Sequence, residues 1–219
     1  DWSAPTVLRK GGAYAASTGW VIHQDKLYWA IDDFGRPSRN RQIIALSASL
    51  KSNLMQSSTW RFSGPNEHPG IPQSFGQGRH DGGVWLEPNV IRHHGKLNVI
   101  VRVRVSGKDS DAKVPNVAAI CTLNDHEDRL DLQFSHYYPV PGAQNQFHIV
   151  HDPKSDLFWM TSNAVTGEAT DSWRGWGKER RFLMLHYARD GLNWFTAGCA
   201  AMWRMETQAF NYASLLIDG

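Results

Sequence analysis

One pattern recurs three times along the sequence: a short apolar segment, a polar turn and a second apolar segment. The second segments begin near Leu27, Leu97 and Leu157, so the repeats are 70 and 60 residues apart. A further apolar run follows each predicted hairpin, and in two repeats a tryptophan, Trp60 or Trp194, closes the unit. Repeats of this length with three or four strands each are typical of β-propeller blades. A β-sandwich, which also contains many short strands, is the alternative.

Nine segments are predicted as strands because they are short, rich in β-branched and aromatic residues, and bounded by turn-forming residues. They are residues 19–23, 27–31, 43–47, 84–92, 97–105, 117–122, 146–151, 157–161 and 182–187. The composition favours the same class, since 10 Trp, 6 Tyr and 9 Phe are set among 19 Gly and 10 Pro. The only helix-like stretch, residues 49–57, is too short to set the architecture. The sequence therefore predicts an all-β fold.

The two ends of the sequence fall within the repeat. Residues 213–219 have the character of residues 89–95, which lie 124 positions, or about two repeats, earlier. Trp2 stands where the closing tryptophan of an earlier unit is expected, 58 positions before Trp60. Since a propeller typically needs at least about four blades to close, we expect residues 1–219 to be part of a single β-propeller domain. In this interpretation three to four blades are present, and the first blade and the C-terminal strands are missing.

Charge and motif content exclude several classes of function. With 23 basic and 21 acidic side chains the net charge is only +2, so no nucleic-acid or anionic-membrane partner is expected. No apolar run approaches the roughly 20 residues of a membrane-spanning helix. Phosphate-loop, HExxH and GxSxG motifs are absent and the ten histidines lack ligand spacing, so no cofactor and no metal site is predicted. Cys121 and Cys199 are predicted to be buried free thiols, with a disulfide as the alternative.

A carboxylate and a guanidinium are expected to meet at one end of the middle hairpin. Glu87 lies 8 residues before the turn glycine Gly95, and Arg102 lies 7 residues after it. Because a hairpin doubles back, residues at similar distances from its turn lie at the same end of the two strands. The sequence therefore predicts Glu87 and Arg102 as neighbours, either in a functional site or in a structural salt bridge.

Four segments, in the order of the chain, resemble the sialidase (neuraminidase) superfamily of six-bladed β-propellers. Glu-Pro, a strand, a turn glycine, a strand and an arginine over 87–102 form the first match. Trp-Ser-Ala-Pro at 2–5 is similar to the tail of the family's Asp-box, the blade-closing turn S-x-D-x-G-x-T-W. Ala-Arg-Asp-Gly-Leu-Asn-Trp at 188–194 is similar to a second, degenerate Asp-box, and Tyr-Ala-Ser-Leu at 212–215 resembles the family's Tyr-Ser-x-Leu. The resemblance spans nearly the whole chain.

The resemblance implies a retaining, metal-independent exo-glycosidase that removes a terminal sialic acid or a related acidic sugar from a glycan, in an extracellular or periplasmic location. Tyr212 is the implied nucleophile and Glu87 the base that takes its proton, since sialidases use a tyrosine in place of a carboxylate nucleophile. Arg102 and Arg180 are implied to bind the carboxylate of the sugar, because planar guanidinium groups pair bidentately with carboxylates. Arg181 is the alternative to Arg180, since only one of two neighbouring residues on a strand faces the site.

The sequence also departs from the family pattern. The turn at 188–194 has Ala in place of Ser and is one residue short. The family's remaining arginine and its acid/base aspartate are expected upstream of residue 1. Asp32 and Asp33 are an acidic pair at the end of a strand and are interpreted as the start of the loop over 33–37 rather than as that acid. The alternatives are a propeller hydrolase for another sugar and a non-catalytic carbohydrate-binding or scaffold propeller.

Overall fold

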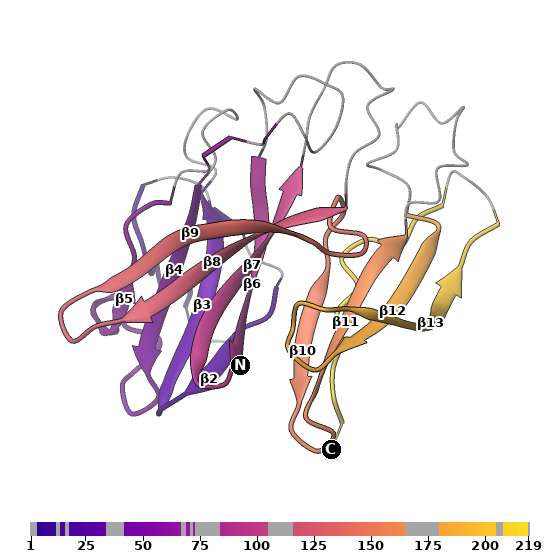
Figure 1. Cartoon of the computed structure of the whole chain (residues 1–219). Coiled ribbons are helices and arrows are strands. Elements are labelled where there is room, and N and C mark those ends of the chain that lie inside the picture. The colour runs from indigo at the N-terminus through magenta and orange to yellow at the C-terminus, as the bar shows by residue number, and fades with distance from the viewer. Residues whose placement is uncertain are drawn as a thin grey trace.

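The computed structural model describes residues 4–11, 14–15, 18–33, 42–66, 69–70, 72, 84–104, 116–164, 180–204 and 208–218. These residues form three antiparallel sheets, and none of them lies in an α-helix (Figure 1). The strands of the first sheet are β1 (Tyr14–Ala15), β2 (Val21–His23), β3 (Lys26–Asp33), β4 (Gln42–Ser49) and β5 (Trp60–Phe62). The second sheet contains β6 (Val84–His93), β7 (Lys96–Arg104), β8 (Val117–Asp125) and β9 (Leu130–Pro139). The third contains β10 (His148–Asp152), β11 (Leu157–Ala164), β12 (Phe182–Ala188) and β13 (Phe195–Met202).

The second and third sheets are meanders in which consecutive strands are neighbours, and the first sheet follows the same pattern from β2 to β5 with β1 added beside β3. The orders are β6-β7-β8-β9 and β10-β11-β12-β13, and in the first sheet β2 and β1 pair with the two ends of β3, followed by β4 and β5. All nine predicted strands are present, and the three predicted hairpins are β2–β3, β6–β7 and β10–β11. The all-β prediction is therefore confirmed, with three sheets in place of the two of a sandwich. The closed six-bladed ring stays a prediction.

Two local predictions are wrong. Residues 49–57 do not form a helix: β4 ends at Ser49, and turns lead to a short 3-10 helix at Ser57–Thr59. Side chains bind the backbone there, with Asn53 Oδ1 accepting the Met55 N–H at 3.0 Å, and such bonds compete with helix formation. Residues 213–218 resemble a strand but pair with no sheet within the described residues. Trp2 and Gly219 lie outside the described residues.

The second sheet is buried on both faces. Val99, Ile100 and Val101 are consecutive on β7 and are all fully buried, so neighbouring side chains enter opposite cores. Val99 and Val101 pack with β3 and β4 of the first sheet, and Ile100 packs with β10 and β11 of the third. The three sheets are therefore stacked face to face, with the third, orange to yellow in Figure 1, beside β6.

Asn89 on β6 joins the three sheets at their innermost strands. Its fully buried side chain accepts the backbone N–H of Gly19 at 3.2 Å and of Ile149 at 3.1 Å, and donates to the carbonyl of Phe147 at 3.1 Å. Gly19, Asn89 and Ile149 are 70 and 60 residues apart, which is the spacing of the sequence repeat. A Cβ at Gly19 would lie 2.7 Å from the Ile149 carbonyl oxygen, so this approach requires glycine.

The two cysteines are free thiols in different surroundings. Cys121 is buried on β8, and burial raises the pKa of its thiol to about 12. Cys199 lies on β13, the outermost strand of the third sheet, and is exposed, so the prediction that both are buried is wrong for Cys199. In the described part of the chain, no helix has the length and apolar character needed to cross a membrane.

Asp125 at the end of β8 ties the second sheet to the first. Its carboxylate accepts hydrogen bonds from Lys26 Nζ at 2.7 Å, from the Tyr28 hydroxyl at 2.6 Å and from Arg61 Nη2 at 2.6 Å. Burial alone would raise the pKa of Asp125, but these hydrogen bonds outweigh burial and hold the pKa below its ordinary value. The ionised form of Asp125 is therefore bound more strongly in the folded state.

The Asp125→Asn variant is expected to lower the free energy of unfolding by about 2 kcal/mol at neutral pH. Because the folded-state pKa is depressed, this contribution is present above the unfolded pKa of about 4 and is lost as the pH falls through the folded value. Urea unfolding at neutral pH and at about pH 3 measures the difference, which should shrink in acid. Asp128→Asn is the control, since Asp128 is exposed and pairs at 3.6 Å with the exposed Arg129. If the difference in unfolding free energy between the wild type and Asp125→Asn is the same at both pH values, the pKa of Asp125 is not depressed in the folded state.

Candidate active site

Glu87 lies in a β-bulge near the start of β6. The pairing of β6 with β7 passes from Leu86 opposite Arg102 to Asn89 opposite Ile100, so two residues of β6 face one of β7. Glu87 has a φ of 49°, which is rare for a residue other than glycine. A bulge re-aims the side chain that it carries and is frequent next to functional sites.

The carboxylate of Glu87 and the guanidinium of Arg102 form an ion pair, as the hairpin spacing predicts. Glu87 Oε2 and Arg102 Nη1 are 2.7 Å apart, and the two side chains are 11% and 6% exposed. Arg102 Nε also donates to the backbone carbonyl of Gln144 at 3.0 Å. In the described residues, no other hydrogen bond of these two side chains is present.

Arg180 and Arg181 point to different partners. Arg180 Nε donates to Asn145 Oδ1 at 3.1 Å, and its Nη1 donates to Asn211 Oδ1. The Arg181 guanidinium lies 5.3 Å from the centroid of the Phe182 ring. Arg180 is therefore joined through Asn145 to the segment that Arg102 also contacts.

The link between the two arginines is a segment that the sequence analysis missed as a site element. Gln144, Asn145 and Gln146, here called the amide segment, are buried in the connection between β9 and β10. Arg102 binds the backbone of the first residue of this segment, and Arg180 binds the side chain of the second. Three consecutive buried side chains that carry polar amides are uncommon, because burial of a polar group is costly without a partner. This run of amides before a predicted strand was the signal that could have indicated the site.

Tyr212 is held between two anchored neighbours. Asn211 is bound by Arg180, and the carbonyl of Ala213 accepts a hydrogen bond from the Thr161 hydroxyl at 3.1 Å. Tyr212 has a φ of 54°, and its side chain is 55% exposed. Within the described residues, its hydroxyl makes no hydrogen bond, and it is not bonded to Glu87. The four predicted residues are thus connected through the amide segment and Asn211 rather than by direct contact between the predicted catalytic pair.

Glu87 and Tyr212, the predicted catalytic pair, both have a strained backbone conformation. Six non-glycine residues in the described part of the chain have positive φ. Four of them occupy the three β-hairpin turns, where such φ values are usual: Gln24, Asp25, His94 and Asp156. The other two are Glu87 and Tyr212. Strained backbone outside turns is concentrated at functional sites, where the surrounding structure maintains it.

The turn at 188–194 follows β12 and is organised by Asp190. Asp190 Oδ1 accepts the backbone N–H of Leu192 at 2.9 Å and of Asn193 at 2.8 Å. Gly191 has a φ of 71°, and a Cβ there would lie 2.5 Å from Ile91 Cδ1. Asp190 thus anchors the turn between β12 and β13, and its assignment as an Asp-box stays a prediction.

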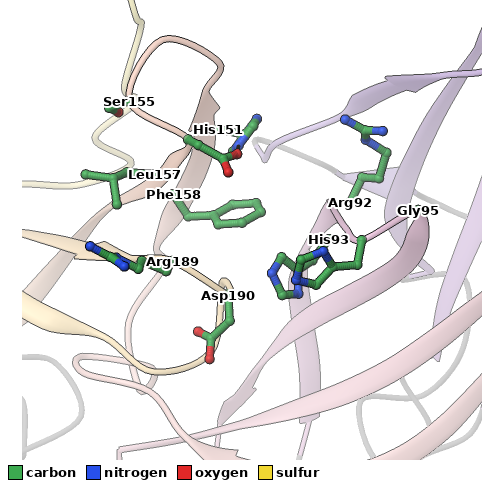
Figure 2. Close-up of a pocket in the computed structure, with 11 residues that line it drawn as sticks. Arg92, His93, Gly95, His151, Ser155, Leu157, Phe158, Arg189 and Asp190 are labelled. Carbon is green, nitrogen blue, oxygen red and sulfur yellow. Dashed lines mark hydrogen bonds and ion pairs between the residues drawn. The ribbon is translucent and has the colours of Figure 1, made fainter.

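A groove of about 780 Å³ lies between the second and third sheets at the end of the hairpin turns (Figure 2). Its lining includes His93, His94, His151 and Phe158. Burial and the neighbouring His94 lower the pKa of His93. The lining of the groove includes none of the four predicted residues. Its residue His93 is six positions from Glu87 along β6, or about 20 Å at 3.3 Å per residue. No group of three metal-ligating side chains occurs among the residues that the structure describes.

The chain has weak structural similarity to a glycoside hydrolase of known structure. No protein-family model and no curated protein matches the chain. Among solved structures, the chain is similar to Zg3597, a family 117 glycoside hydrolase produced by the marine bacterium Zobellia galactanivorans. The two are 13% identical with a TM-score of 0.48, and the match covers 85% of this chain and 46% of that chain. The chain thus spans less than half the length of this neighbour.

Proposed function

We propose that the protein is a sialidase-like retaining exo-glycosidase that removes a terminal sialic acid or a related acidic sugar from a glycan. One observation carries this proposal. Among the described residues other than glycine, Glu87 and Tyr212, the predicted catalytic pair, are the two that have a positive φ outside the hairpin turns. The chain of contacts from Glu87 through Arg102, the amide segment and Arg180 to the neighbour of Tyr212 supports a common site.

In the proposed reaction, Glu87 accepts the proton of the Tyr212 hydroxyl as the phenolic oxygen forms a bond to the anomeric carbon. The bond between that carbon and the leaving oxygen breaks, and a general acid gives the leaving oxygen a proton. In the second step water attacks the anomeric carbon and gives a proton to the conjugate base of that acid. The phenolic oxygen leaves and takes back its proton from Glu87, and the two displacements retain the anomeric configuration. A free phenol is a weak nucleophile without a nearby base, which explains the need for Glu87. A neutral nucleophile also avoids repulsion by the carboxylate of the sugar.

Arg102 and Arg180 would bind the carboxylate of the sugar in this proposal. Arg102 retains its Nη2 group for a ligand, because Glu87 and Gln144 occupy Nη1 and Nε. Arg180 Nε donates to Asn145 Oδ1 and its Nη1 donates to Asn211 Oδ1, and these two hydrogen bonds orient its guanidinium. Two guanidinium groups held in this way favour an anionic substrate over a neutral sugar.

The proposed fold is part of a single six-bladed β-propeller domain that includes residues 1–219. The meeting of the innermost strands at Asn89 supports this arrangement. On the third sheet, Phe195 and Met202 of β13 are more than half exposed, which supports a further sheet packed against this one.

A non-catalytic carbohydrate-binding propeller is the second candidate. The observation that favours it is the ion pair itself, because a buried carboxylate already bound by arginine can serve as a structural salt bridge. In that case the protein would bind acidic glycans and leave them intact.

Hydrolysis of a fluorogenic sialoside by the full-length protein tests the proposed function. We expect release of the fluorophore from the sialoside and no release from the matched galactoside, because only the sialoside offers a carboxylate to the two arginines. Binding of the sialoside without turnover would support the non-catalytic candidate. Cleavage of the galactoside alone would contradict the role of the arginines.

A further inference from the structure

Asp32 makes a close contact with the backbone of Glu87 across two sheets. Asp32 lies near the end of β3 in the first sheet, and the residue is only 1% exposed. Its Oδ1 accepts the backbone N–H of Glu87 at 2.6 Å. The two residues are thus joined although 55 positions separate them in the sequence. The sequence analysis placed Asp32 at the end of a strand, and Asp32 lies at the end of β3.

The bulge creates the need for this contact. Glu87 is not paired with β7, so its N–H has no partner in the sheet. The residue is buried, and a buried N–H without an acceptor is costly. Asp32 supplies that acceptor, and a carboxylate forms a shorter and stronger bond with an N–H than a neutral group does.

The conformation of Glu87 also requires external support. A positive φ is unfavourable for glutamate, and the following proline further restricts the residue. Three side chains hold the bulge: Asp32 at the Glu87 N–H, Asn89 Nδ2 at the Glu87 carbonyl at 3.3 Å, and the Thr18 hydroxyl at the Pro88 carbonyl. Asp32 is the one that carries a full charge.

We infer that Asp32 is a positioning residue that fixes Glu87 in its strained conformation and thereby aims its carboxylate at Arg102. Asp32 acts through the backbone of Glu87, so it is not itself a catalytic residue. The contact stands on geometry alone, and only its consequence for catalysis rests on the proposed function. Asp33, the next residue of β3, points to the opposite face of the strand and is the natural control.

The contact can be measured in the wild-type protein by NMR of the isotopically labelled full-length chain. We expect a strongly downfield Glu87 amide proton and a scalar coupling across the hydrogen bond between the Glu87 nitrogen and the Asp32 carboxylate carbon. Neither measurement depends on a variant that folds. An ordinary amide shift without the coupling would overturn the inference.

Variants then test the role of the charge. In Asp32→Asn, an isosteric change, we expect the Glu87 amide to exchange with solvent at least about tenfold faster, while the amide of Val99 in the core is unchanged. Asp33→Asn should leave the Glu87 amide as in the wild type. In an active enzyme, Asp32→Asn should lower kcat with little effect on KM, because Asp32 does not touch the substrate.

These measurements separate the two proposals. If the sialoside is not cleaved but the coupling is present and exchange responds only to Asp32→Asn, the proposed function fails and the positioning role stands. If the sialoside is cleaved but Asp32→Asn changes neither the Glu87 amide nor kcat, the positioning role fails and the proposed function stands.

Discussion

Replacing Asn89 with alanine should lower the free energy of unfolding by about 4 kcal/mol, because it leaves several buried backbone groups without partners. Two N–H groups, of Gly19 and Ile149, lose their acceptor, and the carbonyls of Glu87 and Phe147 lose a donor. The three sheets meet at this side chain, so no water from the surface replaces it readily. Urea unfolding followed by tryptophan fluorescence measures the change.

Asn98→Ala is the matched control for this experiment. Asn98 lies on β7 of the same sheet and is half-buried, and its side chain makes no hydrogen bond to a described residue. The control should therefore change the free energy of unfolding by less than about 1 kcal/mol. If Asn89→Ala also lowers the free energy of unfolding by less than about 1 kcal/mol, Asn89 does not hold the sheets together.

The inner strands could be predicted from sequence because both of their faces are buried. On β7, Val99, Ile100 and Val101 give a continuous apolar run, which the sequence analysis identified directly. The spacing of the repeat also predicted the three hairpins, since each depends on residues that are close in the sequence. The same spacing recurs in the contacts of Asn89, where Gly19 and Ile149 meet it from the neighbouring sheets.

The sequence analysis did not predict the outer strands β9 and β13, because they are not buried on both faces. Leu130 and Leu132 of β9 are buried, but Ser135 and His136 are exposed, and a register shift interrupts the pairing beside them. β13 is largely exposed and contains several small residues. Neither strand has the steady alternation that a half-buried strand shows, so periodicity does not reveal them.

The contacts of the candidate site also differ in whether the sequence could predict them. Glu87 and Arg102 belong to one hairpin, so simple counting from the turn predicted their contact. Asp32 and the amide segment reach the site through the packing of separate sheets, and their contacts join residues 55 and 42 positions apart. Such contacts follow from tertiary structure, and the run of amides at 144–146 is their one local trace in the sequence.

Removing the hydroxyl of Tyr212 in Tyr212→Phe should reduce kcat for a sialoside at least about a thousandfold, because the nucleophile of the proposed reaction is lost. The free energy of unfolding should not change, since the side chain is exposed and its hydroxyl is not bonded within the described residues. Tyr187→Phe is the control: Tyr187 lies on β12, stacked 5.6 Å from Phe195, and its replacement should leave kcat unchanged. Equal rates for Tyr212→Phe and the wild type would exclude Tyr212 as the nucleophile.

A double-mutant cycle on Tyr212 and Glu87 tests most directly whether the two residues act as one catalytic unit. The kcat of the full-length protein is measured for the wild type, Tyr212→Phe, Glu87→Gln and the double variant, each shown by circular dichroism to be folded. Residues that act together give losses that do not add, so we expect the double variant to be within about tenfold of the slower single variant. If the double variant instead loses the product of the two single losses, about a millionfold where each is a thousandfold, Tyr212 and Glu87 act independently and the proposed site is wrong.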